Sequence, residues 1–300
     1  MKKYLLCNIA VKDIKSNERN FTINILKDVA YYGVRRSSNN NQINYYHVMI
    51  PIADGELNNP EVLESMAFTD SKVDKDTVRS NQLAFRATYA LTEFMLSKMS
   101  ILGYVDSRGQ RQAMNYENFC NTTMFRVEVI QELDTKDIGI FYTDGSSYKT
   151  RGDAGYGMSK LLEETVEADD TALYDSFSGT YRKHSDYCGH IENGTNNMGE
   201  LTGLKAALMN IDDDKMWNVI ISDSDYALKT FRDWYPAWTP KKRKTAQNAE
   251  LIQEIAEIID NLLKNNHIIL FKWTKGHTDT QFNELCDKLA NKGKTSVPSK

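Results

Sequence analysis

The carboxy-terminal half of the sequence predicts an α/β fold in which a mixed sheet is flanked by helices. Four short runs are rich in strand-forming residues: 138–143, 154–158, 219–222 and 268–273. Three further segments fit helices: 198–209, 249–263 and 281–292. Two strands in succession, followed by strands that alternate with helices, are typical of a mixed sheet with helices on its faces.

The first of these strands ends at Asp144 and Gly145, a common turn pair, and the next begins near residue 154. The two strands therefore fit a hairpin. An Asp-Gly pair in this position is often no more than a turn, so Asp144 alone carries no functional prediction.

The amino-terminal half, residues 1–135, predicts a separate α+β domain. Segments 4–11, 44–52 and 124–130 have the composition of strands, and residues 76–99 contain apolar residues at helical spacing without Pro or Gly. The polar segment Gln131–Asp137 is predicted to be a linker to the second domain, residues 136–300. The basic stretch Arg35–Asn41 could contact nucleic acid or could be a solvated loop.

Composition limits the class of protein. A chain of 300 residues with 41% hydrophobic residues is long enough for two domains, and its net charge of −4 weakly repels phosphate. A nucleic-acid partner would therefore need a local basic patch or a bound cation. The four cysteines form no CxxC pair, and no apolar run approaches the roughly 20 residues that span a bilayer. We expect a cytoplasmic protein without a membrane partner.

Four carboxylates fall at the ends of the predicted elements: Asp144, Glu200, Asp223 and Asp287. Catalytic residues gather at the carboxyl ends of strands in open α/β sheets, and a neighbouring helix can add a ligand to the same place. Such a cluster repels itself unless a hard cation binds, and Mg²⁺ prefers oxygen ligands. The pattern therefore indicates phosphodiester hydrolysis with two metal ions.

Four motifs follow one another along the chain in the same order as in a known family. They are Tyr142–Ser146, Thr195–Glu200, Ser222–Ser224, and Trp273–His277 followed by Asn283–Asp287. Residues 138–293 resemble a type 1 ribonuclease H domain, whose sheet has five strands. Residues 1–135 resemble no family. The resemblance implies a nuclease that cuts the RNA strand of an RNA–DNA hybrid, and it leaves any protein partners unknown.

The resemblance also implies roles for the residues of these motifs. Asp144, Glu200, Asp223 and Asp287 would bind two Mg²⁺ ions, for which Mn²⁺ can substitute, and His277 would assist proton transfer or product release. His277 could instead be an ordinary loop residue. The substrate-binding residues implied around the first two motifs are Gly145, Thr195, Asn196 and Asn197. Gly145, Asn196 and Glu200 would meet ribose 2′-hydroxyls, and Thr195 would hold a phosphate of the DNA strand.

A basic, aromatic segment lies between the third and fourth motifs and resembles the family's basic protrusion. Its candidate nucleic-acid contacts are Trp234, Lys241, Lys242, Arg243, Lys244 and Asn248. Cations there can neutralise phosphates while aromatic faces pack on sugars or bases. The four cations could also form a solvated turn.

Two departures from the family pattern leave the substrate open. An acidic insertion around Glu163–Asp170 is predicted to lengthen a hairpin, and Asp225 stands where the family usually has glutamine. Asp225 could weaken hybrid binding or recruit metal. Besides hybrid cleavage, two alternatives therefore remain: a nuclease of this fold that acts on duplex RNA, a retroelement substrate or branched DNA, and a non-catalytic hybrid-binding module.

Overall fold

A computed structural model describes most of the second half of the chain and selected strands of the first. The described residues are 3–12, 30–36, 43–52, 104–105, 111–112, 124–148, 152–169, 171–235, 238–276 and 280–296. The chain divides into two compact units, Lys2–Leu133 and Asp134–Lys300.

The described part of the first unit consists of strands, four of which form a sheet in the order β6-β1-β3-β2. The strands are β1 (Lys3–Lys12), β2 (Ala30–Arg36), β3 (Ile43–Ile52), β4 (Tyr104–Val105), β5 (Arg111–Gln112) and β6 (Met124–Asp134). β3 pairs antiparallel with both β1 and β2. The three predicted strands are confirmed, whereas β2 was not predicted. The predicted helix over 76–99 lies outside the described residues.

The predicted linker Gln131–Asp137 was wrong. β6 continues through Asp134, and a single 3₁₀ turn, η2 (Thr135–Asp137), leads directly into the next strand. Leu133 and Thr135 are buried, whereas Lys136 and Asp137 are exposed. The polar residues that suggested a linker therefore belong to a strand and a tight turn.

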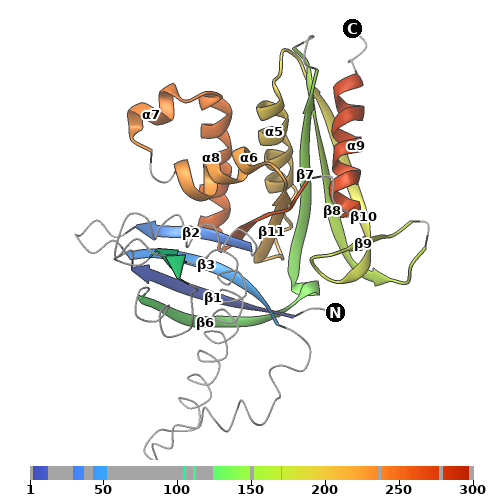
Figure 1. The fold of residues 1–300 in the computed structure, drawn as a ribbon. Coiled ribbons are helices and arrows are strands. Elements are labelled where there is room, and N and C mark those ends of the chain that lie inside the picture. Colours follow the sequence, from blue (N-terminus) through green and yellow to red (C-terminus); the bar gives the residue numbers. More distant parts are fainter. Residues whose placement is uncertain are drawn as a thin grey trace, which may run out of the picture. The chain divides into compact units, whose positions relative to one another are not determined.

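The second unit is built on a mixed sheet, in the order β12-β11-β7-β8-β10-β9 (Figure 1). Its strands are β7 (Ile138–Ser147), β8 (Ala154–Val166), β9 (Leu173–Asp175), β10 (Thr180–Ile191), β11 (Trp217–Ser222) and β12 (Ile268–Trp273). β7, β8, β10 and β9 are antiparallel neighbours, whereas β11 runs parallel to both β7 and β12. Because parallel and antiparallel pairs occur together, the predicted mixed α/β sheet is confirmed; β9, with three residues, is a short strand beyond the five that were predicted.

Burial explains which strands the sequence revealed. All six residues of β11 are buried, as expected for a parallel strand that is covered on both faces. β10 was missed because its residues are mostly half-buried and polar, without apolar alternation. The acidic segment after Leu162 extends β8 to Val166, which pairs with Tyr181 of β10. The first part of the acidic segment therefore belongs to β8, and β9 follows it in the chain.

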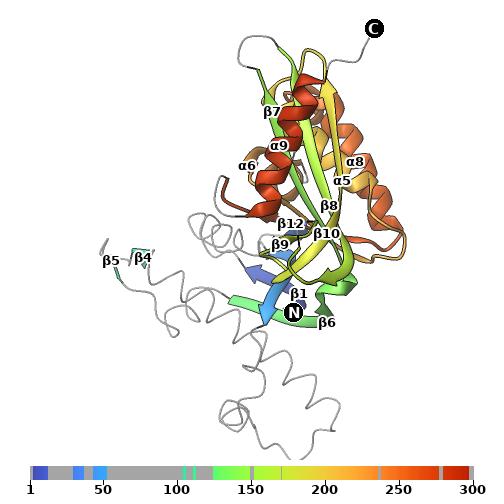
Figure 2. The same cartoon turned by 90° about the vertical axis from the view of Figure 1, so that its right-hand side faces the viewer.

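Three long helices cover the sheet: α5 (Asn196–Met209), α8 (Ala249–Lys264) and α9 (Gln281–Thr295). All three were predicted, with ends that differ by up to three residues. α9 lies on one face of the sheet, and α5 with α8 on the other (Figures 1 and 2). Two short helices, α6 (Asp225–Lys229) and α7 (Pro240–Thr245), were not predicted. Among the described residues, no helix is both long and apolar enough to cross a membrane.

Candidate active site

Asp144 lies near the end of β7, on the face of the sheet that α9 covers. It pairs with Gly157 of β8, and a Cβ atom at Gly157 would meet the carbonyl oxygen of Cys286 in α9 at 2.3 Å. Directly opposed residues of an antiparallel pair point to the same face, so the Asp144 side chain also faces α9. The side chain is only 6% exposed, and its Oδ1 atom accepts a hydrogen bond of 2.7 Å from the Gly145 amide.

Glu200 comes from the second turn of α5. Thr195 caps this helix by accepting a hydrogen bond from the Met198 amide at 3.3 Å. The helix approaches β7 very closely, because a Cβ atom at Gly145 would lie 2.2 Å from the Glu200 nitrogen. Only glycine allows this approach, which brings the Glu200 carboxylate beside Asp144.

Asp223 follows the last residue of β11. Ser222 pairs with Thr143 of β7 in parallel register, so Asp223 and Asp144 leave neighbouring strands at the same edge. The Asp223 carbonyl accepts a 3.0 Å hydrogen bond from Trp273 Nε1, and its carboxylate accepts a 3.4 Å bond from Asn283 Nδ2. These contacts fix the turn after the strand.

The three side chains converge. Asp144, Glu200 and Asp223 each offer one oxygen atom, and these atoms all lie within 4.8 Å of one another. Glu200 is 7% exposed, and its Oε2 atom is buried without a hydrogen-bond partner among the described residues. A buried carboxylate oxygen without a donor is unfavourable unless a cation binds it.

Burial and mutual repulsion shift the acidity of this cluster. The pKa of Asp144 is raised from 3.8 to about 7, mainly by burial and next by the charge of Asp223; the Gly145 amide opposes the shift, and the charge of Asp287 adds to it. Burial also raises the pKa of Glu200 well above its ordinary value, with the charges of Asp144 and Asp223 acting in the same direction. A divalent cation would reverse these shifts by favouring the charged forms. The donor set, all hard oxygen atoms, suits Mg²⁺ or Mn²⁺.

Asp287 lies on α9, outside the group of three but close enough for its charge to raise the pKa of Asp144. Its Oδ1 atom accepts a 3.0 Å hydrogen bond from Asn291 Nδ2. His277 lies outside the described residues.

The first substrate-binding candidates surround the start of α5. Thr195 and Asn196 are exposed and Asn197 is half-buried. Asn196 Nδ2 donates to Glu200 Oε1 at 3.4 Å, which places an exposed amide next to the carboxylate cluster. Together with the Gly145 backbone, these groups form one polar edge beside the site.

Asp225 is the first residue of α6 and does not belong to the group of three. It is exposed and forms an ion pair of 2.6 Å with Lys229, one turn later. Asp225 therefore lies beside the third carboxylate in sequence, but its charge is partly offset by a lysine.

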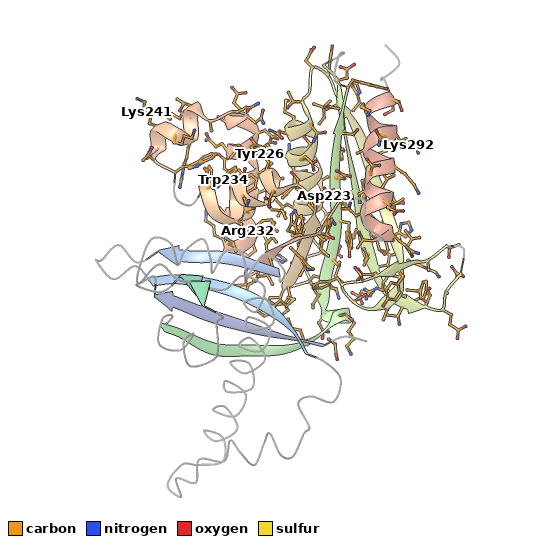
Figure 3. The ribbon with its side chains drawn as sticks, viewed as in Figure 1. Asp223, Tyr226, Arg232, Trp234, Lys241 and Lys292 are labelled. Atoms are coloured by element: carbon orange, nitrogen blue, oxygen red, sulfur yellow. The ribbon has the colours of Figure 1, made fainter. Side chains whose placement is uncertain are left out.

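Two substrate-binding candidates, Trp234 and Asn248, contact the ring or the hydroxyl of Tyr226. Trp234, 39% exposed, packs edge-on against Tyr226, whose hydroxyl accepts a 3.2 Å bond from Asn248 Nδ2 (Figure 3). Asn248 adopts the left-handed conformation, with φ of 59°, just before α8. Trp234 and Asn248 therefore both contact Tyr226.

The basic residues of the protrusion form α7, which begins at Pro240 after the capping residue Thr239. Lys241, Lys242 and Lys244 are exposed. Arg243 differs, because its guanidinium lies 4.3 Å from the Tyr235 ring centre and donates to the Tyr235 carbonyl at 3.3 Å. The helix therefore exposes its lysines, of which Lys242 also lies over the Trp238 ring at 5.8 Å, and uses the arginine for packing on Tyr235.

Two residues near the carboxylates were not predicted as site residues. Asn283 is buried and contacts Asp223, and Asn291 contacts Asp287. Asn283 belongs to the fourth motif, which was a usable signal. Asn291 follows Asp287 by one helical turn, and only that spacing could have suggested the contact.

The second half of the chain is similar to known proteins. Ribonuclease H from Chromobacterium violaceum is 29% identical over 172 residues, which cover 55% of this chain and 100% of that protein. Ribonuclease H from Pseudomonas fluorescens is 34% identical over 163 residues, which cover 52% of this chain and 91% of that protein. A solved structure, described as LC9-RNase H1, a type 1 RNase H with the type 2 active-site motif, covers 52% of this chain and 72% of its own at 22% identity, with a TM-score of 0.40. The family model for RNase H matches residues 136–295, just over half of the chain. The chain therefore belongs to the ribonuclease H family of enzymes.

Proposed function

We propose that this protein is a metal-dependent endonuclease that hydrolyses the RNA strand of RNA–DNA hybrids. The observation that carries the proposal is the convergence of Asp144, Glu200 and Asp223, with one oxygen each within 4.8 Å, in a member of the ribonuclease H family. The Oε2 atom of Glu200, buried without a hydrogen-bond partner in the described part of the chain, supports a cation at this point.

Asp144, Glu200, Asp223 and Asp287 would hold two Mg²⁺ ions, or Mn²⁺ in their place. Bound there, the ions would activate a water molecule for attack on phosphorus and stabilise the leaving oxygen. The protein holds the carboxylates in place through the Gly145 amide, Asn196, Asn283 and Asn291. His277, four residues before the start of α9 in the sequence, would assist proton transfer or product release.

Choice of the RNA strand would come from the polar edge beside the site. The Gly145 backbone, Asn196 and Glu200 would meet ribose 2′-hydroxyls. Thr195, beside them, would hold a phosphate of the DNA strand, and Asn197 would add a further substrate contact at the start of α5. Since Asn196 Nδ2 and Glu200 Oε1 are 3.4 Å apart, one 2′-hydroxyl can contact both groups.

The DNA strand would lie along the protrusion. The exposed lysines of α7 can neutralise phosphates, and Trp234 and Asn248 offer an aromatic face and an amide near Tyr226. Figure 3 shows Lys241 on α7, well separated from Asp223, as expected if the two regions contact different strands.

Cleavage assays test the proposal. The full-length protein is incubated with end-labelled RNA–DNA hybrid, duplex RNA, duplex DNA, branched DNA and single strands, in Mg²⁺, Mn²⁺ or EDTA. We expect cleavage of the RNA strand of the hybrid, with either metal and not in EDTA. Asp144→Asn should reduce the rate by more than about 100-fold, the upper end of the loss seen when outer-shell partners of a metal are removed. Hybrid binding should be retained, because the substitution also removes repulsion toward phosphate.

A hybrid with a central 2′-deoxy patch in its RNA strand tests the mechanism of strand choice. The patch should be spared, because each unpaired polar group costs about 1–3 kcal/mol and several are lost together. Equal cutting of duplex DNA or duplex RNA would assign the protein to the other substrate classes. Tight hybrid binding without any cleavage would indicate a binding module.

A further inference from the structure

A polar network joins the end of β7 to the last turns of α9, next to the carboxylate cluster. Its members are Ser146, Asp287, Asn291 and Lys294. Ser146 lies two residues after Asp144 in the same strand. The network therefore connects two elements that each carry a carboxylate of the site.

Asn291 is the centre of this network. Its Nδ2 atom donates to both the carbonyl oxygen and the Oδ1 atom of Asp287, at 2.9 and 3.0 Å. Its Oδ1 atom accepts from Ser146 Oγ at 2.9 Å and from Lys294 Nζ at 2.7 Å. Lys294 also donates to Ser146 Oγ at 2.7 Å and lies over the Tyr148 ring at 4.7 Å.

The chemistry of the partners fixes which way the amide faces. A lysine ammonium can only donate, and a carbonyl oxygen can only accept. If the Asn291 amide were turned around, its NH₂ group would face Lys294 and its oxygen would face Asp287. Four favourable contacts therefore hold a single orientation of the side chain.

This arrangement acts on Asp287 in two ways. A bond to the main-chain carbonyl together with a bond to the carboxylate of the same residue restricts the Asp287 side chain to one rotamer. It also takes one of the two lone pairs of Oδ1, so that Oδ2 and the second lone pair of Oδ1 are left for a cation. The contact between Ser146 and Asn291 spans 145 residues of sequence, so the network is a tertiary feature and not a local helix contact.

We propose that Asn291 is a positioning residue that orients Asp287 toward a divalent cation, with Ser146 and Lys294 holding Asn291 in place. The inference rests on the proposed metal-binding role of Asp287. It assigns the amide to the class of outer contacts that orient metal ligands and raise metal affinity.

Calorimetric titration of the full-length protein with MgCl₂, and with MnCl₂ as a second probe, tests the assignment without substrate. Asn291→Leu removes all four hydrogen bonds at similar volume and should weaken the apparent affinity by about 10-fold, the low end for such partners. Asn291→Gln keeps the amide and should recover part of the loss. Lys292→Leu is the matched control, because Lys292 is exposed on the outer side of α9, and it should leave metal affinity unchanged (Figure 3).

A positioning role for Asn291 also predicts different effects on the maximal cleavage rate and on the Mg²⁺ concentration that the reaction requires. The cleavage rate of Asn291→Leu should approach that of the parent at saturating Mg²⁺, with the loss expressed in the Mg²⁺ concentration at half-maximal rate. Unchanged metal affinity in Asn291→Leu would overturn the assignment. Should that variant fail to fold, Ser146→Ala decides. It removes the bond to Asn291 and the bond from Lys294 but no charge, and it should weaken Mg²⁺ binding by about two- to threefold, half a kcal/mol or slightly more.

The outcomes distinguish this inference from the proposed function. A protein that binds Mg²⁺ in an Asn291-dependent manner but cuts no hybrid would contradict the function and retain the positioning role. A protein that cuts hybrid with metal affinity independent of Asn291 would do the reverse.

Discussion

Asp144 is buried among other carboxylates, and this gives the metal-free protein a measurable pH dependence. Because the pKa of Asp144 rises from 3.8 to about 7 on folding, the folded state binds its proton more tightly than the unfolded chain does. Both states are protonated below pH 3.8, and both are ionised above about pH 7. The contribution of Asp144 to the free energy of unfolding therefore falls as the pH rises through this window.

Asp144→Asn should remove this loss. In EDTA, the variant should gain stability relative to the parent as the pH is raised from 5 to 8, by about 1–3 kcal/mol, since one pKa unit corresponds to about 1.4 kcal/mol. Urea unfolding at the two pH values measures the difference. Asp213→Asn, which removes a carboxylate from an exposed turn, is the control and should show no such growth. If the difference in the free energy of unfolding between Asp144→Asn and the parent is the same at both pH values, burial does not raise the pKa of Asp144.

Asp225 should oppose substrate binding rather than bind metal. It is exposed, lies outside the carboxylate group, and pairs with Lys229 at 2.6 Å. Asp225→Gln removes one negative charge and frees the lysine for phosphate. We expect hybrid affinity to rise by about two- to fivefold at low salt, since an exposed charge is worth about 0.2–1 kcal/mol.

Fluorescence anisotropy in EDTA measures the affinity of Asp225→Gln, with Asp213→Gln as the control for a general loss of negative charge. A decrease in turnover together with weaker Mg²⁺ binding would instead give Asp225 a role at the metal.

The carboxylates and their supports differ in how well the sequence reveals them. Asp144 and Asp223 each come at the end of a readable strand, so the fold class alone predicts that they lie close together. Asn291 has no such signal, because its contacts with Ser146 and Asp287 depend on side-chain directions across two packed elements. Tertiary contacts of this kind carry no sequence periodicity.

At the scale of elements, α7 separates its cations into two kinds. Lys241, Lys242 and Lys244 are exposed, whereas Arg243 packs on Tyr235. Replacing the three lysines by Ala while keeping Arg243 therefore tests phosphate contact and keeps the packing of Arg243 on Tyr235, although it removes the contact between Lys242 and the Trp238 ring.

The triple lysine variant should bind hybrid more weakly and with a flatter salt dependence. Each neutralised phosphate contributes about 0.9 to the slope of log affinity against log salt, so the slope should fall by up to about three units. Lys264→Ala, which removes an exposed cation at the end of α8, should leave the slope nearly unchanged. An unchanged slope in the triple variant would show that α7 does not meet phosphate.

Elements with a strong apolar period were predictable, and those without one were not. α8 carries a buried stripe, Ile252, Ile255, Ala256 and Ile259, and its bounds differ from the prediction by one residue. β10 has mixed polar residues and is held by pairing with β8. α7 is too short for periodicity, and its start depends on the cap at Thr239. Where pairing or capping replaces apolar patterning, composition indicates only a loop.

At the scale of the whole molecule, the family match and the division of the chain coincide. The match covers residues 136–295, and the second compact unit is Asp134–Lys300. This unit contains the sheet β12-β11-β7-β8-β10-β9, the three long helices and all four carboxylates. Curated relatives about as long as this segment are matched over nearly their whole length.

We therefore predict that a shortened chain of residues 134–300 folds and cuts hybrid by itself. Its apolar core is formed by its own elements, for example Phe141, Leu204, Ile220 and Phe271, each fully buried, and a domain with its own core can fold alone. It begins before Thr135, because this residue is buried in η2 and the Lys136 carbonyl accepts a 2.8 Å bond from Lys215. The shortened chain should show one cooperative thermal transition, and its cleavage rate should lie within about 10-fold of the full-length rate, a change of about 1.4 kcal/mol in barrier.

A shortened chain beginning at residue 138 is the matched comparison and should be less stable, since it lacks Thr135 and Lys136. If residues 134–300 are insoluble or inert while the full-length protein cuts, the first unit contributes to the core or to the site.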